Sequence, residues 1–408
     1  MTEIENATCL IAGGGPAGLM CGCLLARSGV NTIVLEKHED FLRDFRGDTI
    51  HPSTLEIMHE LGVLENFLRL PHQDVSYAEA DIAGTSVRLA DFTRLPVQHQ
   101  RLVLMPQWNF LNFISQEAKK LPNFKLLMKT EAKSILREGE RVSGLRVEDE
   151  KGERDIHASG LVIAADGRNS RLRDDAGLLV NTIGAPMDVL WFKLNHRAND
   201  DQQVIAGRVE SGQFLVMIYR GDYWQCALII CKGTAKSIKA RGIEDFRRRV
   251  AKLAKRDTAE EIKSWDDVKL LAVQIDRLKE WHKPGLLFIG DAAHAMSPIG
   301  GVGINLAIQD AVAAANLLYE PLGSGQIEEG DLARVQRRRA FPTWATQQLQ
   351  IAIQKRVIGP TLRGANPRVI WPIKLMQYWP WLQRFPARVI GLGFRPEHVH
   401  SPLKLESL

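Results

Sequence analysis

The chain has 408 residues, of which 45% are hydrophobic and 25% are charged, and its formal net charge is +5. These proportions are ordinary for a globular protein, and the length predicts a large core and two closely connected domains. No run approaches the roughly 18 consecutive apolar residues that span a bilayer. Residues 1–7 are mostly polar and lack a signal-peptide pattern, so we expect a cytoplasmic protein.

The cysteine pattern argues against disulfides and metal ligands. The chain has five cysteines, which lie in apolar or small-residue runs: Cys9, Cys21, Cys23, Cys226 and Cys231. An odd number in such surroundings predicts buried, reduced thiols. We therefore expect no metal site.

The first structural signal is a glycine-rich turn between a strand and a helix. An apolar strand is predicted over 9–12, a helix over 19–28 and a second strand over 31–35. The turn at residues 13–18 reads Gly-Gly-Gly-Pro-Ala-Gly. This order of elements is typical of a dinucleotide-binding βαβ unit.

Each key glycine of this turn has its own steric task. Gly13 permits the tight turn, Gly15 lets the backbone approach a pyrophosphate, and Gly18 lets the helix pack closely on the strand. The helix N-terminus supplies N–H donors and the positive end of the helix dipole. Glu36 follows the second strand, at a position that suits binding of a ribose hydroxyl.

The next segment combines basic side chains with a helix start. Arg43 and Arg46 lie in a loop, where they either reach the cofactor phosphates or remain solvated. Pro52 fits the first position of a helix. Ser53 and Glu56 have the spacing of a capping box.

The middle of the chain changes to short, alternating strands. A helix is predicted over 110–120, a β-meander over 124–149, and a buried strand over 160–165 that ends in Asp166-Gly167. Four strand-like runs then predict an antiparallel sheet: 189–195, 203–210, 213–219 and 223–231. A charged helix or helix pair is expected over 242–263.

A second strand–turn–helix comes late in the chain. A buried strand over 286–289 leads to the acidic turn Gly290-Asp291, a loop rich in proline and glycine, and a helix that begins near Gly303. Because glycine has no Cβ, Gly300 and Gly301 let the backbone approach a bound group closely. This segment indicates a second contact with the same cofactor.

These three marks stand in the order of one known family. The turn at 13–18, Asp166-Gly167 and Gly290-Asp291 follow one another along the chain. With these motifs, residues 7–320 resemble the single-component FAD-dependent aromatic hydroxylases, which are the para-hydroxybenzoate hydroxylase-like flavoprotein monooxygenases. The resemblance implies an α/β fold with a Rossmann-like, glutathione-reductase-type FAD-binding domain. It also implies an inserted antiparallel-sheet substrate domain and a C-terminal helical region.

The same resemblance suggests the domain boundaries. We expect a discontinuous FAD-binding domain at 1–75, 101–180 and 275–330. The substrate-binding domain then comprises 76–100 and 181–274. Residues 331–408 form a helical, basic C-terminal region.

The resemblance also implies cofactor contacts, position by position. Glu36 binds the adenosine ribose, Arg46 the pyrophosphate side, Gln107 the ribityl or phosphate region and Asp291 a ribityl hydroxyl. Backbone N–H groups of residues 300–305 face the flavin pyrimidine edge, where they stabilise negative charge. The cofactor-binding residues expected are Gly13, Gly15, Pro16, Ala17, Gly18, Glu36, Lys37, Arg46, Thr49, Gln107, Asp166, Gly167, Gly290, Asp291, Pro298, Gly301, Val302, Gly303, Ile304 and Asn305.

The implied reaction is a monooxygenation of an aromatic or other electron-rich small molecule. NADPH or NADH reduces FAD, oxygen forms a flavin C4a-hydroperoxide, and one oxygen atom passes to the substrate. Pro298 would border the substrate side of the flavin. His51 is a candidate general base for a phenol, with local hydrogen bonds at a helix entry as its alternative role.

The substrate is expected between the flavin and the sheet of residues 187–231. Alternation along a strand does not tell which face of the sheet points inward. The candidates from both faces are Trp191, Arg208, Phe214, Met217, Tyr219 and Trp224.

The C-terminal region is basic and rich in tryptophan. Residues 334–396 hold twelve Lys or Arg and no Asp or Glu, with four of the nine tryptophans. One interpretation is a peripheral membrane contact through 369–395. The other is a packed helical cap with solvated arginines, which Pro372, Pro380 and Pro386 favour because they interrupt a long amphipathic helix.

Other functions stay open at this point. One is a hydroxylase or reductase of a prenylated, lipophilic substrate at the membrane surface. A tryptophan-type halogenase would carry a Gly-Trp-x-Trp-x-Ile-Pro motif, which Gly221–Cys226 does not match. An alternative from another class of function is a non-catalytic protein that has the FAD fold and escorts prenylated proteins. We expect a small-molecule substrate, no nucleic acid partner, and a monomer or homodimer.

Overall fold

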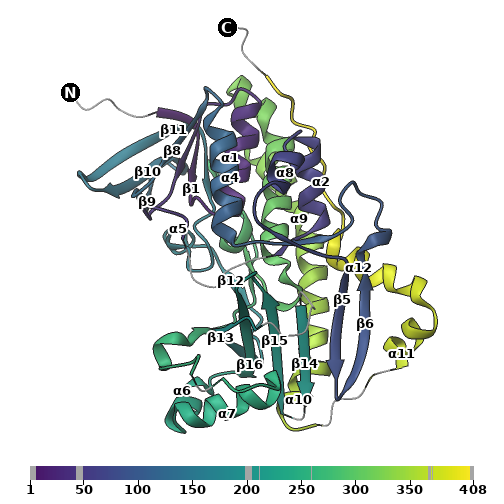
Figure 1. Ribbon diagram of the computed structural model, residues 1–408. Helices are drawn as coiled ribbons and strands as arrows, with labels where there is room; N and C mark the ends of the chain where they lie inside the picture. The colour runs from purple at the N-terminus through teal and green to yellow at the C-terminus, as the bar shows by residue number, and fades with distance from the viewer. Residues whose placement is uncertain are drawn as a thin grey trace.

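The computed structural model describes residues 6–42, 49–197, 205–210, 212–258, 260–365, 369 and 371–404. Two large sheets, one above the other in Figure 1, are connected by long helices, and the C-terminal helices lie along one side. This arrangement confirms the predicted fold class, a Rossmann-like layer with an antiparallel-sheet layer and a helical C-terminal region.

The first layer is an eight-stranded sheet. Its strands β20, β11, β1, β2 and β8 lie side by side and run parallel, as in a dinucleotide-binding unit. β10 and β19 pair antiparallel with β11 and β20, and β9 pairs antiparallel with β10. The bounds are β1 (Asn6–Ala12), β2 (Thr32–Leu35), β8 (Phe124–Leu127), β9 (Glu131–Glu138), β10 (Arg141–Asp149), β11 (Gly152–Ala164), β19 (His282–Lys283) and β20 (Leu286–Phe288).

Helices α1 (Pro16–Arg27), α4 (Gln107–Lys119) and α8 (Gly303–Ser324) cover one face of this sheet. Their apolar side chains form the largest core cluster with α2 (Pro52–Glu60) and α3 (Leu64–Leu68). By length and composition, Ile299–Ser324 is apolar enough to cross a membrane, but 72% of its apolar window is buried in the fold. Such burial is typical of a core helix in a packed domain.

Two local predictions were wrong. β8 does not join a meander with β9 but pairs parallel with β2, so only β9, β10 and β11 form consecutive antiparallel neighbours. Ser53 and Glu56 form no capping box, because His51 is the N-cap residue of α2 and makes no side-chain cap bond. The Glu56 carboxylate instead accepts the backbone N–H of Gln98.

The second layer is a seven-stranded sheet in the order β17-β13-β16-β15-β14-β5-β6. Its pairs are antiparallel except β14 with β5. Helices α6 (Ala235–Ala240) and α7 (Ile243–Ala254) cover its outer face. The strands are β5 (Tyr77–Ile82), β6 (Thr85–Asp91), β13 (Met187–Asn195), β14 (Ile205–Glu210), β15 (Gln213–Tyr219), β16 (Tyr223–Cys231) and β17 (Lys269–Leu271).

Two three-stranded sheets lie beside these layers. One orders β3 (Thr49–Ile50), β7 (Leu102–Leu104) and β4 (Gln73–Val75), and the other β12 (Val180–Thr182), β18 (Asp276–Leu278) and β21 (His294–Ala295). A short helix, α5, spans Arg171–Asp175. Single 3₁₀ turns occupy Phe92–Arg94, Trp265–Asp267, Gly290–Ala292, Ile299–Gly301 and Pro380–Gln383.

The long helix α9 (Glu329–Ile353) packs against α8 and runs from the first layer toward the second (Figure 1). A π-helical turn (Gln354–Ile358) and α10 (Gly359–Leu362) continue it, and α11 (Trp371–Tyr378) and α12 (Arg384–Gly391) follow. The last described residues return to the first layer, where the Lys404 N–H donates to the Arg27 carbonyl.

Candidate active site

The turn at 13–18 has the steric properties that a pyrophosphate site needs. A Cβ on Gly13 would lie 2.3 Å from the Ala165 carbonyl oxygen, and one on Gly18 would lie 1.9 Å from that of Gly13. A Cβ on Gly15 would meet no protein atom within 4 Å. Protein packing therefore explains Gly13 and Gly18, whereas open space above Gly15 leaves room for a ligand. Pro16 and Ala17 begin α1 directly after this space.

The Glu36 carboxylate closes the same turn from the side. It is buried, and it accepts the backbone N–H groups of Gly14 at 3.1 Å and His38 at 3.0 Å. These bonds fix the carboxylate at the end of β2, beside the glycine turn. Lys37 next to it is exposed. Both positions suit the adenosine side of the cofactor, and their role there stays a prediction.

The segment that follows β3 is pinned to the start of α8. The buried Asn305 side chain accepts the His51 backbone N–H at 2.8 Å and the Thr54 hydroxyl at 2.7 Å. Its amide group donates to the Thr49 carbonyl at 3.1 Å. Residues 49–54 and the α8 N-terminus thus form one unit. The neighbouring candidates Arg43 and Arg46 lie outside the described residues.

His51 is buried at the entry to α2. Its Nδ1 donates to the Ile390 carbonyl at 2.6 Å, its Nε2 is buried, and the ring lies near the Gly300 and Gly301 backbone. Burial lowers the pKa of His51 to about 4, although the nearby carbonyl groups oppose that shift. The imidazole is therefore neutral at pH 7. These contacts favour the local hydrogen-bonding role, and its function as a general base stays a prediction.

The two acidic motifs meet through an arginine that sequence reasoning overlooked. Arg168, directly after Asp166-Gly167, pairs with Asp291 at 3.0 Å. Burial raises the pKa of Asp166, while hydrogen bonds from Ser170 and nearby backbone groups partly offset it. Gly167 adopts a left-handed φ of 86°. In the sequence, the only indication of the ion pair between Arg168 and Asp291 was the position of Arg168 directly after the Asp-Gly turn.

The flavin-edge segment, defined as Pro298–Asn305, ends in an open helix N-terminus. Gly300 and Gly301 have φ values of 77° and 63°, which glycine adopts readily. α8 has Val302 as N-cap and no side-chain cap bond, so its first N–H groups receive no side-chain acceptor at that position. An added Cβ on Gly303 would meet nothing within 4 Å. The α8 N-terminus at Val302 and Gly303 is therefore partly exposed and has no side-chain cap, whereas the Gly301 N–H donates to the Pro298 carbonyl at 3.1 Å.

A row of glutamines on α9 and the π-helical turn that continues it holds this segment from behind. Gln350 donates to the carbonyls of Ser297 and Ile299, both at 2.9 Å, and accepts the Ser297 N–H at 3.1 Å. Gln347 donates to the Ala295 carbonyl and Gln354 to the Ser297 hydroxyl. The three glutamines repeat at helical spacing on one face. In the sequence, this spacing indicates that the three side chains share one helix face, but it does not indicate which groups they contact.

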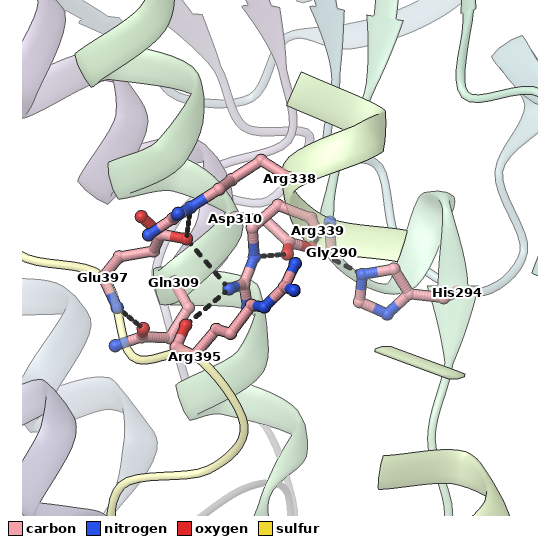
Figure 2. A network of polar contacts seen from close by, with 8 residues as sticks. All are labelled: Gly290, His294, Gln309, Asp310, Arg338, Arg339, Arg395 and Glu397. Atoms are coloured by element: carbon pink, nitrogen blue, oxygen red, sulfur yellow. Dashed lines mark hydrogen bonds and ion pairs between the residues drawn. The ribbon is translucent and has the colours of Figure 1, made fainter. Parts of the chain in front are cut away.

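A buried ionic network connects the Gly290-Asp291 turn to α9 (Figure 2). Asp310 of α8 accepts the Gly290 N–H at 3.1 Å and pairs with His294 at 2.5 Å and Arg339 at 2.9 Å. Burial alone would raise the pKa of Asp310, but His294 and Arg339 outweigh it and lower the pKa. Asp310 therefore stays ionised and holds the turn in place.

The same network reaches the C-terminal segment (Figure 2). Glu397 pairs with Arg339 at 3.2 Å and Arg338 at 2.7 Å, and its N–H donates to the Gln309 side chain. Arg339 also donates to the Arg395 carbonyl. Arg339 is 1% exposed, whereas Arg338 is 47% exposed. The buried arginine thus bridges α8, α9 and the chain after α12.

The two faces of the seven-stranded sheet divide the predicted substrate residues. Trp191 and Phe214 lie on the inner face, in a cluster with Ile299 of the flavin-edge segment. Met217, Tyr219 and Trp224 lie on the outer face and pack with α6 and α7. Arg208 also faces outward, because it donates to the Leu253 carbonyl of α7. The prediction that Arg208, Met217, Tyr219 and Trp224 line the substrate is therefore wrong.

A cavity adjoins the flavin-edge segment. Its walls come from the α8 start, α9, the α2 entry, α12 and the segment after it, and they include His51, Ile299, Val302, Ile353, Ile390 and Phe394. Most of these walls are apolar, as in sites that take small organic ligands. Pro298 lies beside the cavity wall at Ile299 and is partly exposed.

Gln107 is the first residue of α4 and is partly buried. All five cysteines are free thiols, and burial raises the pKa of Cys9, Cys21, Cys23 and Cys226. In the part of the chain that the structure describes, no group of three or more His, Cys, Asp or Glu side chains is arranged to hold a metal ion.

These features together fit FAD. The open space at Gly15 suits the pyrophosphate, the paired Asp291 has the carboxylate that a ribityl hydroxyl requires, and the uncapped α8 N-terminus suits the negative pyrimidine edge. All three lie along one edge of the parallel sheet. The position is the carboxyl end of its strands, where such folds bind ligands.

Comparisons with known proteins agree with this site. The family model described as an FAD binding domain matches residues 6–349. The chain belongs to this family, and it is an FAD-dependent monooxygenase of the aromatic-hydroxylase class. This result removes the non-catalytic escort from the alternatives.

Several curated relatives are monooxygenases. The 6-methylpretetramide 4-monooxygenase of Streptomyces rimosus is 31% identical over 86% of this chain and 84% of its own length. The para-nitrophenol 4-monooxygenase of a Pseudomonas strain is 23% identical over 81% of this chain and 83% of its own length. Rifampicin monooxygenase of Streptomyces venezuelae is 25% identical, and the match covers 74% of this chain but 62% of that protein.

Solved structures share the fold. The anhydrotetracycline hydroxylase OxyS from Streptomyces rimosus has a TM-score of 0.76 at 20% identity, over 96% of this chain and 77% of that chain. The probable FAD-dependent monooxygenase pqsL from Pseudomonas aeruginosa has a TM-score of 0.74 at 22% identity, over 88% and 99%.

Proposed function

We propose that the protein uses NADH or NADPH and oxygen to hydroxylate an extended, apolar phenolic compound. The observation that carries this proposal is the apolar cluster against which both the inner sheet face and the flavin-edge segment pack. Trp191 and Phe214 reach the same cluster as Ile299, so a flat aromatic substrate between them lies next to the flavin edge. The para-nitrophenol named for the Pseudomonas relative supports a phenolic substrate, and the 6-methylpretetramide named for the Streptomyces rimosus relative supports a larger one.

The chain's own residues divide the work of the reaction. When bound, FAD supplies the redox and oxygen-activating chemistry. The glutamines of α9 and Asn305 fix the flavin-edge backbone, so its N–H donors are oriented before any charge develops. Trp191 and Phe214 exclude water and orient the substrate ring. Pro298 would form the border between the substrate and the flavin.

The proposal is tested on protein reconstituted with FAD. A panel of simple phenols and polycyclic phenols is screened for stimulated NADH and NADPH oxidation, and products are analysed for one added oxygen atom. We expect stimulation together with an oxygenated product, strongest for polycyclic compounds. FAD-loaded protein that oxidises the nicotinamide at one rate with every compound, and yields no oxygenated product, would contradict the proposal.

Two positions on β15 give a matched pair of variants. Phe214→Ala removes a ring from the inner face and should raise the substrate KM about ten-fold or more, since it removes one buried aromatic contact. Tyr219→Ala removes a ring from the outer face, so the KM should stay within about two-fold. Steady-state kinetics with the best substrate measures both. Equal effects of the two variants would place the substrate elsewhere.

A further inference from the structure

The helices α11 and α12 and the turn between them carry an exposed aromatic surface, called here the α11–α12 surface. Five rings form it: Trp371, Tyr378, Trp379, Trp381 and Phe385, with exposed fractions of 74%, 80%, 55%, 47% and 50%. Trp381 and Phe385 pack edge to face at 5.9 Å. Large aromatic side chains gathered in this way at a surface mark a site of interaction. In Figure 1 α11 lies at the side of the molecule, beyond β5 and β6, and α12 lies at the end of these strands.

This surface is held in place without burying its rings. None of the residues of α11 is buried, and its Gln377 side chain donates to the Arg88 carbonyl of β6 at 2.8 Å and accepts the Arg88 N–H. α12 instead packs closely, because a Cβ on Gly391 would lie 2.8 Å from Leu95. Ala387 on the same face is fully buried. The helices are thus docked by one side while the aromatic side faces outward.

The charged side chains of α11 and α12 are all positive. Lys374, Arg384 and Arg388 are exposed, and the Arg384 guanidinium lies 5.3 Å and 5.0 Å from the Trp381 and Phe385 ring centres. Residues 334–396 contain no Asp or Glu. In the adjoining β5–β6 hairpin, Glu79 pairs with Arg88 and the buried Asp91 with Arg94. The complementary partner is therefore anionic.

Aromatic rings mixed with basic side chains fit a lipid bilayer of negative surface charge. Trp and Tyr prefer the headgroup region, and each nearby Lys or Arg adds attraction to anionic lipids. A symmetric contact between two copies of the chain would instead bring like charges together, which is unfavourable. The surface is also continuous with the active-site region, since Val389 and Ile390 of α12 line the cavity beside the flavin-edge segment.

We propose that the α11–α12 surface docks peripherally on anionic membranes. The rings enter the headgroup region while the basic side chains meet lipid phosphates, and the cavity wall formed by α12 then lies close to the bilayer. This inference goes beyond the proposed hydroxylase function and does not depend on it. Membrane binding is measured without any substrate or turnover.

The experiment uses the full chain loaded with FAD and vesicles of phosphatidylglycerol and phosphatidylcholine. Flotation measures the bound fraction against lipid concentration. We expect binding to the anionic vesicles, weaker binding to pure phosphatidylcholine, and a loss of binding at high salt. Emission of the exposed tryptophans should be quenched by lipids brominated near the headgroup.

Two variants separate the contributions. Lys374→Glu, Arg384→Glu and Arg388→Glu together should weaken binding to anionic vesicles about ten-fold or more. Trp379→Ser with Trp381→Ser should weaken binding to both kinds of vesicle. The matched control Lys236→Glu, Arg248→Glu and Lys252→Glu makes the same charge change on exposed residues of α6 and α7, and it should bind within about two-fold of the wild type.

Three outcomes would overturn the proposal. The first is a wild-type protein that does not float with anionic vesicles. The second is an equal loss of binding in the control, which would indicate a response to net charge alone. The third is a wild-type dimer that the Trp379→Ser, Trp381→Ser variant turns into a monomer, as measured by light scattering, while vesicle binding is unchanged.

Discussion

The flavin-edge region (Gly290–Asp310) and the α11–α12 surface reach the same cavity, but they are stabilised in opposite ways. In the first region, glycines and buried polar side chains fix the backbone, and Asp310, Asn305 and Gln350 each make several hydrogen bonds. In the second, apolar and aromatic side chains lie exposed, and one glutamine attaches α11 to β6.

This difference follows from what each region must meet. A cofactor edge requires donors at fixed positions, so the backbone is held by directional bonds. A lipid surface requires no fixed geometry, so exposed rings and charges are sufficient. His51 connects the two regions, because its imidazole donates to the Ile390 carbonyl of α12 and its backbone N–H to Asn305.

The largest expected effect comes from breaking the buried network of the flavin-edge region. Arg339→Met removes one charged partner each from the buried carboxylates Asp310 and Glu397, whose negative charges are then less well compensated. The free energy of unfolding should fall by about 3–5 kcal/mol. Denaturant unfolding of FAD-free protein measures it.

The neighbouring residue supplies the control. Arg338→Met removes the other partner of Glu397, but from a half-exposed position, and should cost about 1 kcal/mol or less. If the two variants cost the same, the buried network would not be what stabilises this region.

The contact between the two regions should depend on pH. The pKa of His51 is lowered from 6.5 to about 4 in the folded protein, so the unfolded chain takes up the proton first. Stability from this group is present above pH 6.5 and is lost as pH falls toward 4, by about 3 kcal/mol. The His51→Gln variant should lack this loss. Unfolding curves of both proteins between pH 7 and 4 test it, and parallel pH dependences would refute it.

The same variant tests the catalytic prediction for His51. A general base contributes about 10²-fold or more to a rate. If His51 only positions the backbone, His51→Gln should retain substrate hydroxylation with an unchanged pH profile. A large fall in kcat that excess alkali partly restores would support the base.

The smallest stability effect is expected at the α11–α12 surface. Trp379→Ser with Trp381→Ser removes exposed rings and should change the free energy of unfolding by about 1 kcal/mol or less. Thermal unfolding measures it. A loss as large as that of Arg339→Met would show that the rings are part of the folded core, and the contrast between the regions would fail.

The sequence was most informative where steric demands restrict residue type. Gly13 and Gly18 occupy positions where a Cβ would collide with backbone, and Gly300 and Gly301 have left-handed φ values. Such requirements leave a local mark in the sequence. The βαβ start, the antiparallel sheet and the late strand–turn–helix were therefore predicted correctly.

Features that depend on distant partners left no such mark. Alternation in β15 places Phe214 and Met217 on opposite faces, but it does not tell which face meets the flavin-edge segment. The ion pair of Arg168 with Asp291 spans far-separated parts of the chain. The Ser53 capping box was wrong because Asn305, from α8, organises the α2 entry instead.

The central claim, that one FAD site joins the three motifs, is tested most directly at Gly15. A Cβ there meets no protein atom, so Gly15→Ala should leave the stability of the FAD-free protein within about 0.5 kcal/mol of wild type. It should nevertheless weaken FAD binding about ten-fold or more, because the methyl group occupies the pyrophosphate space. Titration of FAD fluorescence against both FAD-free proteins measures this, and equal FAD affinities would contradict the account.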